Sequence, residues 1–415
     1  MSDDGRGSGN RPALSRCIAV APDRFAAEYW GSRPLLSRSA DLGEDFSDLF
    51  STDAVDELIS GRALRTPFIR MAREGTVLAP SRFTASGGFG AEIGDQVSSE
   101  KVLQEFEDGS TIVLQGLHRT WQPLADFTRQ LVADLGHPCQ VNAYITPASS
   151  RGFDPHYDVH DVFVIQVAGD KHWTIHEPVH PDPLRDQPWT DHRDAVAARA
   201  TGSPAIDATF HPGDVLYLPR GWIHSATALG GVSVHLTIGV AAYTRADVVQ
   251  RVIARASDDA KVRSSLPLGI DFDDPAQLAS IVQETADALL VQLREAATDA
   301  RTAADVARTL AARLRDDTRP EPVRPLSAVH AAESLDGDTI VQVRQGLAAH
   351  SSVDGERVCI QLPDKTVKLP VAARAAVELL LDAGRVRVAD LPGLDVDSAV
   401  VVARRLVREG VLAVR

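Results

Sequence analysis

Cysteine, aromatic residues and long apolar runs are all scarce in this sequence. Its 415 residues include three cysteines, Cys17, Cys139 and Cys359, which lie far apart and form no CxxC pair, so neither a disulfide scaffold nor a structural zinc site is indicated. There is no run of about 18 apolar residues, and the polar N-terminus lacks the apolar segment of a secretion signal. We therefore expect a cytoplasmic protein that is neither exported nor inserted into a membrane.

Positive charge is also in short supply. The chain has 43 lysines and arginines against 57 aspartates and glutamates, which gives a formal net charge of −14. This excess of acid disfavours nucleic acid and anionic membranes as partners, and it is compatible with a basic protein or peptide substrate. The length and the 44% content of hydrophobic residues suit a globular protein of two or three domains.

The pattern of apolar residues divides the chain into four parts. Residues 1–20 are mostly polar and are predicted to be disordered. Residues 21–243 begin with short helices and continue as strands. Residues 244–318 have helical periodicity with an apolar stripe too wide for a solvated helix, which predicts packing against a partner helix such as that of a second subunit. After a proline-rich linker, residues 326–415 show the order of helices and strands that is typical of a winged helix.

Many short apolar strands separated by Gly, Pro and Asp turns are predicted between Gln140 and Thr237. Only a closed or nearly closed sheet hides its edges and encloses a pocket, so these strands predict a small β-barrel within an α+β fold. The polar section from Pro178 to Ala205 interrupts them. It is either a lid or substrate loop, or a surface insertion without a role in the site.

Two stretches bring together residues that can bind a metal ion. In GFDPHYDVHDVFVIQVAGDKHW, His156 and Asp158 are two residues apart in a predicted strand, so their side chains face one side, about 6–7 Å apart. GDVLYLPRGWIH fits the second motif of the cupin superfamily, G-x5-P-x-G-x2-H, and ends at His224. Gly169 falls where the first cupin motif expects its glycine. The two stretches together predict that His156, Asp158 and His224 bind one metal ion.

The ligand types indicate which ion this is. Two imidazoles and one carboxylate suit Fe(II) and leave positions open for a cosubstrate and oxygen, whereas a closed structural zinc site would need a fourth protein ligand. 2-Oxoglutarate commonly supplies the electrons that such iron requires, and its far carboxylate then needs a cation on the barrel wall. Lys171 is the candidate, although spacing alone favours a turn lysine after Gly169 and Asp170.

Two other histidines lie on predicted strands and are possible metal ligands. His160 shares the strand parity of His156 but would lie about 13 Å from it on an extended strand, which is too far for both to reach one ion. His235 stands between apolar neighbours on a later strand, where it either faces the pocket or is a hydrogen-bonded core residue, and the second interpretation is favoured. Neither is included in the predicted ligand set.

The whole chain resembles the JmjC ribosomal oxygenases, which are cupin-fold protein hydroxylases that use Fe(II) and 2-oxoglutarate. The resemblance implies a double-stranded β-helix, the JmjC barrel, over residues 21–243, then a helical dimerisation region and a C-terminal winged helix. The segments that carry it are FAAEYWGSRPLL, NAYITP, GFDPHYDVHDVFVIQVAGDKHW, PGDVLYLPRGWIHSA and SVHLTIG.

The resemblance also implies roles for individual residues. His156, Asp158 and His224 would hold the iron, and Lys171 would anchor the far carboxylate of 2-oxoglutarate. Asn142 and Tyr144 match positions near the cosubstrate. The implied reaction uses O2 to hydroxylate an amino-acid side chain, arginine or histidine, of a ribosomal protein or another protein or peptide, and the implied assembly is a homodimer.

Two alternatives differ in function. A non-catalytic cupin with a winged helix would act as a ligand sensor and would bind DNA through residues such as Arg404, Arg405 and Arg408. However, acids and bases are about equal in number in the last 60 residues, which favours a structural or protein-contact role for the winged helix. The other alternative keeps the chemistry but places it on a small metabolite or an RNA base.

Overall fold

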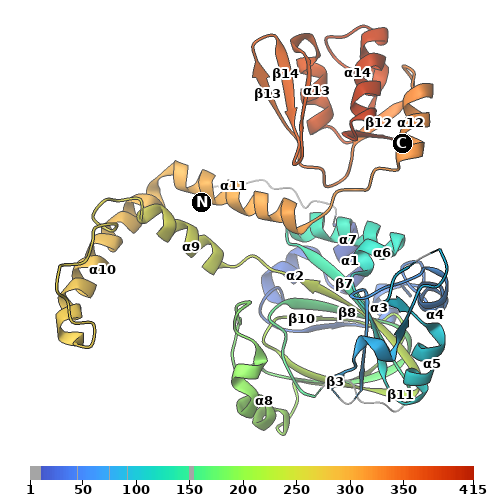
Figure 1. The fold of residues 1–415 in the computed structure, drawn as a ribbon, viewed down its shortest axis with the longest axis vertical. Coiled ribbons are helices and arrows are strands. Elements are labelled where there is room, and N and C mark those ends of the chain that lie inside the picture. The colour runs from blue at the N-terminus through green and yellow to red at the C-terminus, as the bar shows by residue number, and fades with distance from the viewer. Residues whose placement is uncertain (1–10, 44, 74, 91, 149–153) are drawn as a thin grey trace. The chain divides into compact units, whose positions relative to one another are not determined.

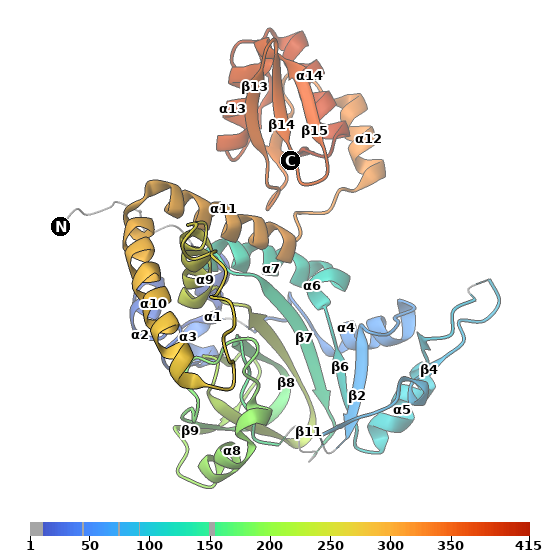
Figure 2. The ribbon, with the colours of Figure 1, turned by 60° about the vertical axis from the view of Figure 1, so that its left-hand side comes forward.

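The protein is described here by a computed structural model covering residues 11–43, 45–73, 75–90, 92–148 and 154–415. The chain forms two compact units, one made of residues 1–241 with 320–415 and the other of residues 242–319. The ribbon is shown in Figure 1 and, turned by 60°, in Figure 2.

A nine-stranded antiparallel sheet forms the predicted barrel region. Its strand order is β1-β10-β8-β11-β7-β6-β2-β3, with β9 paired to β8. Its strands are β1 (Leu35–Ser37), β2 (Ile69–Arg73), β3 (Thr76–Val77), β6 (Thr111–Leu114), β7 (Cys139–Thr146), β8 (Asp161–His176), β9 (Ile206–Phe210), β10 (Val215–Leu218) and β11 (Ile223–Val240).

The two longest strands, β8 and β11, run side by side through the middle of this sheet. They pair along both of their halves, with a register shift between Leu229 and Val234. Each had been predicted as two shorter strands because Gly169-Asp170 and Gly230-Gly231 resemble turns. That expectation is wrong, since Gly169 adopts φ +61° and bends β8 without ending it.

Alternate residues of the sheet face two different apolar layers. Phe163 and Ile165 of β8 pack outward in a large core shared with the helices, whereas Val162 and Val164 face inward in a smaller cluster. Successive side chains of a strand point to opposite faces, so a strand that is covered on both faces contributes alternate residues to two apolar layers. The helices that contribute buried residues to the outer core include α1 (Pro12–Cys17), α2 (Pro22–Glu28), α4 (Thr52–Asp56), α5 (Ser99–Glu107) and α7 (Gln122–Leu135).

The prediction that residues 1–20 are disordered is wrong where these residues form helix α1 (Pro12–Cys17). Leu14 and Cys17 are buried in the outer core, and the amides of Ala13 and Leu14 both donate to the Asp134 carboxylate at 2.9 Å. Burial of an apolar face and pairing of the helix's free amides stabilise a segment whose composition alone looks polar. The rest of the prediction, over residues 1–10, lies outside the described residues.

Residues 242–319 form a unit of three helices, α9 (Arg245–Ala256), α10 (Pro275–Thr298) and α11 (Ala300–Asp317). Arg313 on α11 pairs with Asp247 on α9 at 2.6 Å, and Asp247 also closes a capping box with Thr244. Apolar side chains on α10, among them Val282 and Leu290, remain exposed. Within the described residues, no helix combines the length and the apolar character needed to cross a membrane.

Residues 320–415 have a hydrophobic core of their own. The predicted helices and final strand are present, as is a three-stranded antiparallel sheet, β13-β14-β15, that was not predicted. The elements are α12 (Pro325–Ser334), β12 (Ile340–Val343), β13 (His350–Asp354), β14 (Arg357–Gln361), β15 (Thr366–Pro370), α13 (Arg374–Asp382), β16 (Val386–Arg387), α14 (Val396–Arg408) and β17 (Leu412–Val414).

The bend of β8 at Gly169 leads to a prediction about the stability of the barrel. A Cβ at Gly169 would lie 2.1 Å from the Val232 carbonyl oxygen, whereas nothing lies within 4 Å of one at Gly230, which has a similar φ of +69°. Gly230→Ala should cost about 1–2 kcal/mol from the left-handed backbone alone, and Gly169→Ala should cost more than about 3 kcal/mol. Urea unfolding followed by tryptophan fluorescence measures both, and equal losses would contradict the close β8–β11 approach.

Candidate metal centre

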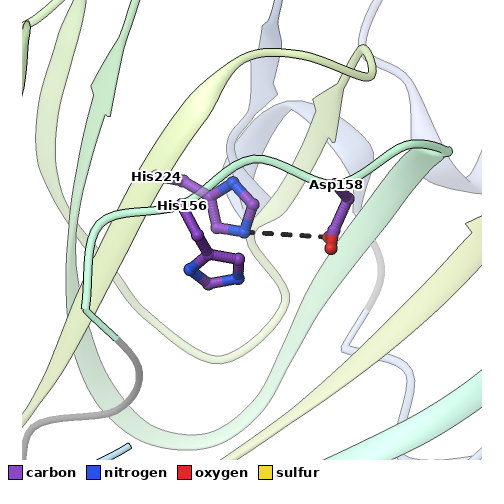
Figure 3. A group of neighbouring side chains, drawn as sticks. All are labelled: His156, Asp158 and His224. Carbon is purple, nitrogen blue, oxygen red and sulfur yellow. Dashed lines mark ion pairs between the residues drawn. The ribbon is translucent and has the colours of Figure 1, made fainter. Parts of the chain in front are cut away.

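The three predicted ligands lie together at one end of the β8–β11 pair (Figure 3). One ligand atom from each of His156, Asp158 and His224 lies within 4.8 Å of the other two. His224 Nε2 is 3.8 Å from Asp158 Oδ2, and the two imidazole centroids are 4.4 Å apart. Spacings of this size allow all three groups to reach a single ion at about 2 Å each.

The segment that carries His156 and Asp158 is not the regular strand that was predicted. His156 makes an isolated β-bridge with His224, in which the amide of each donates to the carbonyl of the other at 3.2 and 2.8 Å. The Asp158 carbonyl accepts from the Gly221 amide at 3.0 Å, so beyond His156 the segment pairs with a turn. Strand β8 begins only at Asp161. The ligand spacing is therefore set by the bridge and the turn.

Backbone carbonyls orient both imidazoles. His156 Nδ1 lies 2.8 Å from the Asp154 carbonyl oxygen, and His224 Nδ1 lies 3.1 Å from that of Trp222. A carbonyl oxygen can only accept, so each Nδ1 carries the proton and each Nε2 keeps its lone pair. Histidine ligands in proteins are commonly fixed by such a contact of the other ring nitrogen.

The protonation states also suit a metal site. Burial, reinforced by the neighbouring His156, lowers the pKa of His224 to about 4. Burial alone would raise the pKa of Asp158, but the adjacent His160, His224 and His156 outweigh it and leave that pKa below its ordinary value. At neutral pH, His224 is therefore neutral and Asp158 is a carboxylate, which are the forms that bind metal.

The turn before His224 is held by the Pro178–Ala205 insertion. Gly221 adopts φ +86°, and a Cβ there would approach the His180 carbonyl oxygen to 2.8 Å. Arg220 pairs with Asp161 at 3.5 Å and with Asp182, in the insertion, at 3.2 Å. Of the two interpretations of this section, a loop without a role in the site is therefore disfavoured, because the insertion packs on the turn that places a ligand.

The metal centre opens into a cavity of about 560 Å³. The cavity is large enough for a small cosubstrate together with part of a second molecule. Besides the three ligands, its walls include Arg70, Thr111, Tyr144, Thr146, Asp154, Val162, Val164, Lys171, Trp173, Trp189, Arg193, Ser225, Ala226, His235 and Thr237.

Lys171 is a buried cation in the wall of this cavity. Its side chain donates to Thr146 Oγ1 at 3.1 Å and approaches His235 Nδ1 at 3.4 Å, and the residue is 3% exposed. Burial lowers the pKa of Lys171 to about 7. No carboxylate among the described residues forms an ion pair with it, which is unusual for a buried charge unless an anionic ligand completes the pair.

The other two predicted residues differ in position. Tyr144 lines the cavity and stacks on His235 with centroids 5.0 Å apart and planes 6° apart. Asn142 shares its strand face, but its side-chain oxygen accepts from the Gly116 amide at 3.1 Å, and it is not among the residues that line the cavity. The Asn142 side chain therefore fixes the backbone at Gly116 and does not line the cavity.

Several cavity residues escaped the sequence analysis. Thr146 could have been found, because positions 142, 144 and 146 alternate along one strand face. His235 is buried, as the favoured interpretation expected, and it also lines the cavity, where it lies against Lys171 and Tyr144. No local sequence pattern identifies Arg70 on β2, or Trp189 and Arg193 in the insertion, as cavity residues. Only the fold brings these residues to the cavity.

The chemistry of the donor set matches Fe(II). The group holds two imidazole nitrogens and one carboxylate, and no fourth His, Cys, Asp or Glu joins it among the described residues. A three-ligand site beside a cavity leaves coordination positions for exogenous molecules, as in the two-histidine, one-carboxylate oxygenases. The residues present therefore fit the ion that the ligand types predict.

Comparison with known proteins agrees with this reading. Residues 117–248 match the family model described as the JmjC domain. The chain is 27% identical to ribosomal oxygenase 1 of Gallus gallus over 259 residues, 60% of this chain and 41% of that protein. It is 28% identical to ribosomal oxygenase 2 of Mus musculus over 224 residues, 53% of this chain and 45% of that protein. The chain thus spans less than half the length of these relatives.

A solved structure shows the same fold. The structure of YcfD, a ribosomal oxygenase from Escherichia coli, in complex with cobalt and 2-oxoglutarate aligns with 96% of this chain and 99% of its own, with 17% identity and a TM-score of 0.50. The JmjC match, the relatives and this fold agree with the residue-level resemblance. The chain is thus similar to the JmjC domain over residues 117–248, to the ribosomal oxygenases in sequence and to YcfD in fold.

Proposed function

We propose that the protein is an Fe(II)- and 2-oxoglutarate-dependent oxygenase that hydroxylates a side chain of a protein or peptide. The observation that carries this proposal is one cavity that contains both a three-ligand metal centre and a buried lysine for which the described residues offer no carboxylate partner. The first group suits Fe(II), and the second suits the far carboxylate of a dicarboxylic acid that chelates it. The solved structure of YcfD with cobalt and 2-oxoglutarate supports the same pairing.

Each residue has a defined task in this reaction. When bound, the cofactor pair transfers one atom of O2 to a substrate carbon while 2-oxoglutarate is oxidised to succinate and carbon dioxide. His156, Asp158 and His224 would hold the iron. Lys171 would donate to the far carboxylate, with Thr146 and His235 fixing its amine. Apolar Val162, Val164 and Trp173 line the same cavity and limit the entry of water.

The relatives' names suggest a ribosomal protein as the substrate, and the resemblance suggests arginine or histidine as the target residue. We also propose that the helical unit of residues 242–319 pairs with that of a second copy, because α10 leaves apolar side chains exposed. Residues 320–415 would then be a winged helix that contacts protein. A cytoplasmic location remains part of this proposal.

The DNA-binding alternative has little support in the basic residues it depends on. Arg404 donates to the carbonyls of Ala332 and Leu335, which ties α14 to α12. Arg405 pairs with Glu409 at 2.7 Å. Arg404, which is held by two carbonyls, is poorly placed to neutralise phosphate, and Glu409 offsets the charge of Arg405.

The first prediction concerns the carboxylate ligand. Asp158→Ala should abolish succinate formation from 2-oxoglutarate, because the iron loses its only anionic protein ligand. Succinate is measured by mass spectrometry in the presence of Fe(II) and O2, with metal content determined in parallel. Arg38→Ala, which removes a pair with Asp214, is a control for the loss of a charge elsewhere in the barrel. Continued succinate formation in Asp158→Ala would refute the assignment.

The second prediction concerns the anchor. Lys171→Ala removes a buried charged partner of the cosubstrate, a change that typically costs about 2–5 kcal/mol. The KM for 2-oxoglutarate should therefore rise at least about thirtyfold, whereas the affinity for Fe(II) should stay the same. An unchanged KM would show that the far carboxylate is bound elsewhere.

The third prediction is a pH dependence of cosubstrate binding. Since the pKa of Lys171 without ligand is about 7, binding of 2-oxoglutarate above pH 7 must be accompanied by proton uptake. The Kd should be constant just below pH 7 and rise about tenfold per pH unit above it. Lys171→Arg, which stays charged, should remove this slope. Calorimetric titrations between pH 6.5 and 9 in the presence of Mn(II) measure the Kd for 2-oxoglutarate. A wild-type Kd that does not change with pH would contradict the prediction.

A further inference from the structure

Trp189 brings an oxidisable side chain to the metal centre. It begins the 3-10 helix Trp189–His192 of the insertion and lines the same cavity as the three ligands. The centroid of its indole lies 6.3 Å from that of the His156 imidazole, with the planes tilted by 54°. Aromatic rings in contact have centroids about 4.5–7 Å apart. The indole therefore touches a ring that would hold the iron.

Contacts with the ligand segment and within the insertion hold this indole in place. Tyr157, the residue between two of the ligands, donates its hydroxyl to the Gln187 carbonyl at 3.1 Å. Trp189 packs against a buried cluster that includes Tyr157. The guanidinium carbon of Arg193 lies 5.0 Å from the centroid of the indole. The ring is thus positioned at the metal centre by the same segment that carries two of the ligands.

The cavity wall contains two further phenol or indole rings, Tyr144 and Trp173, and neighbouring rings cover both. Tyr144 lies face to face with His235, with centroids 5.0 Å apart. Trp173 is 6.2 Å from the His224 ring, but it is 5% exposed and stacks on Phe210 at 5.7 Å. The half-buried indole of the insertion is therefore the ring that combines access from the cavity with contact to an iron ligand.

We infer that Trp189 is the chain's own oxidation site, hydroxylated on its indole ring when no substrate is bound. This inference rests on the proposed function, because the reaction uses the same 2-oxoglutarate and O2. While a substrate is bound, its own C–H bond would take the oxygen atom. Without substrate, the nearest accessible C–H bonds are those of the protein.

The reaction balances without a further oxidant or reductant. One oxygen atom of O2 enters a C–H bond of the indole and forms a hydroxyl that keeps the hydrogen. The other oxygen atom becomes part of the succinate carboxylate as 2-oxoglutarate releases carbon dioxide. The ring carbon and 2-oxoglutarate each give up two electrons, and O2 accepts all four.

The test is the mass of two neighbouring tryptic peptides. Full-length protein is incubated with Fe(II), 2-oxoglutarate, O2 and catalase, without substrate, and then digested. Residues 186–193 contain Trp189 as their one tryptophan, and residues 172–185 contain Trp173 as theirs. Residues 186–193 should gain one oxygen atom at least about tenfold more often than residues 172–185, because a reacting group misplaced by about 1 Å can lose a hundredfold in rate.

Three controls identify the source and the place of this oxygen. With isotopically labelled O2, the added atom should be the heavy isotope. Omission of 2-oxoglutarate, or the change Asp158→Ala, should leave both peptides unmodified. Fragment masses distinguish Trp189 from His192, the other oxidisable residue of residues 186–193. Oxygen found mainly on Trp173 or Tyr144, or on none of these residues, would overturn the inference.

A second readout requires no turnover. Co(II) bound at the three ligands should quench the fluorescence of a nearby indole, so Trp189→Phe should reduce the loss of emission on addition of Co(II). Trp121→Phe is the matched control, because Trp121 donates to the Leu49 carbonyl and does not line the cavity, and it should leave this loss unchanged. Equal quenching in wild type and Trp189→Phe would show that the indole does not adjoin the metal.

One further measurement separates this failure from that of the proposed function. Equilibrium dialysis of 2-oxoglutarate against Mn(II)-loaded protein shows whether the cosubstrate binds. Retained 2-oxoglutarate without oxygen on Trp189 would overturn the self-oxidation inference alone. Failure to retain 2-oxoglutarate would contradict the proposed function itself.

Discussion

The antiparallel register between β8 and β10 positions the three ligands of the candidate metal centre. The His156–His224 bridge extends this register past the start of β8 and the end of β10, and it joins two ligands through their own backbone atoms. Asp158 is then placed by its carbonyl's bond to Gly221. Because the ligands are fixed through the main chain, their geometry does not depend on the metal being bound, which is the preorganisation that a catalytic site needs.

Burial then decides what the site can bind. The same low-dielectric cavity keeps His224 neutral and lowers the pKa of Lys171, so the lysine's charge is costly until an anion pairs with it. A dicarboxylic acid that reaches both the iron and the lysine would remove this cost. The cavity would therefore select its cosubstrate by charge as well as by shape.

The sequence predicted the site better than the backbone that builds it. The ligand set was predictable because its residues fall within two short motifs with chemically diagnostic spacing. Lys171 was predicted only through the family resemblance, because its spacing alone favours a turn lysine. The strands were divided incorrectly because a glycine that bends a strand and a glycine that ends one have the same local signal. Arg70 could not be assigned, since its place beside Tyr144 depends on the register of three strands far apart in the chain.

The central claim is that one cavity binds Fe(II) and 2-oxoglutarate together. The most direct measurement is visible absorption under anaerobic conditions, as Fe(II) and then 2-oxoglutarate are added to the protein. If both bind, the wild type should show the charge-transfer band of a chelated iron–oxoglutarate pair, and His156→Ala should not. A wild-type protein that binds Fe(II) but shows no band on addition of 2-oxoglutarate would show that the cavity does not bind the two together.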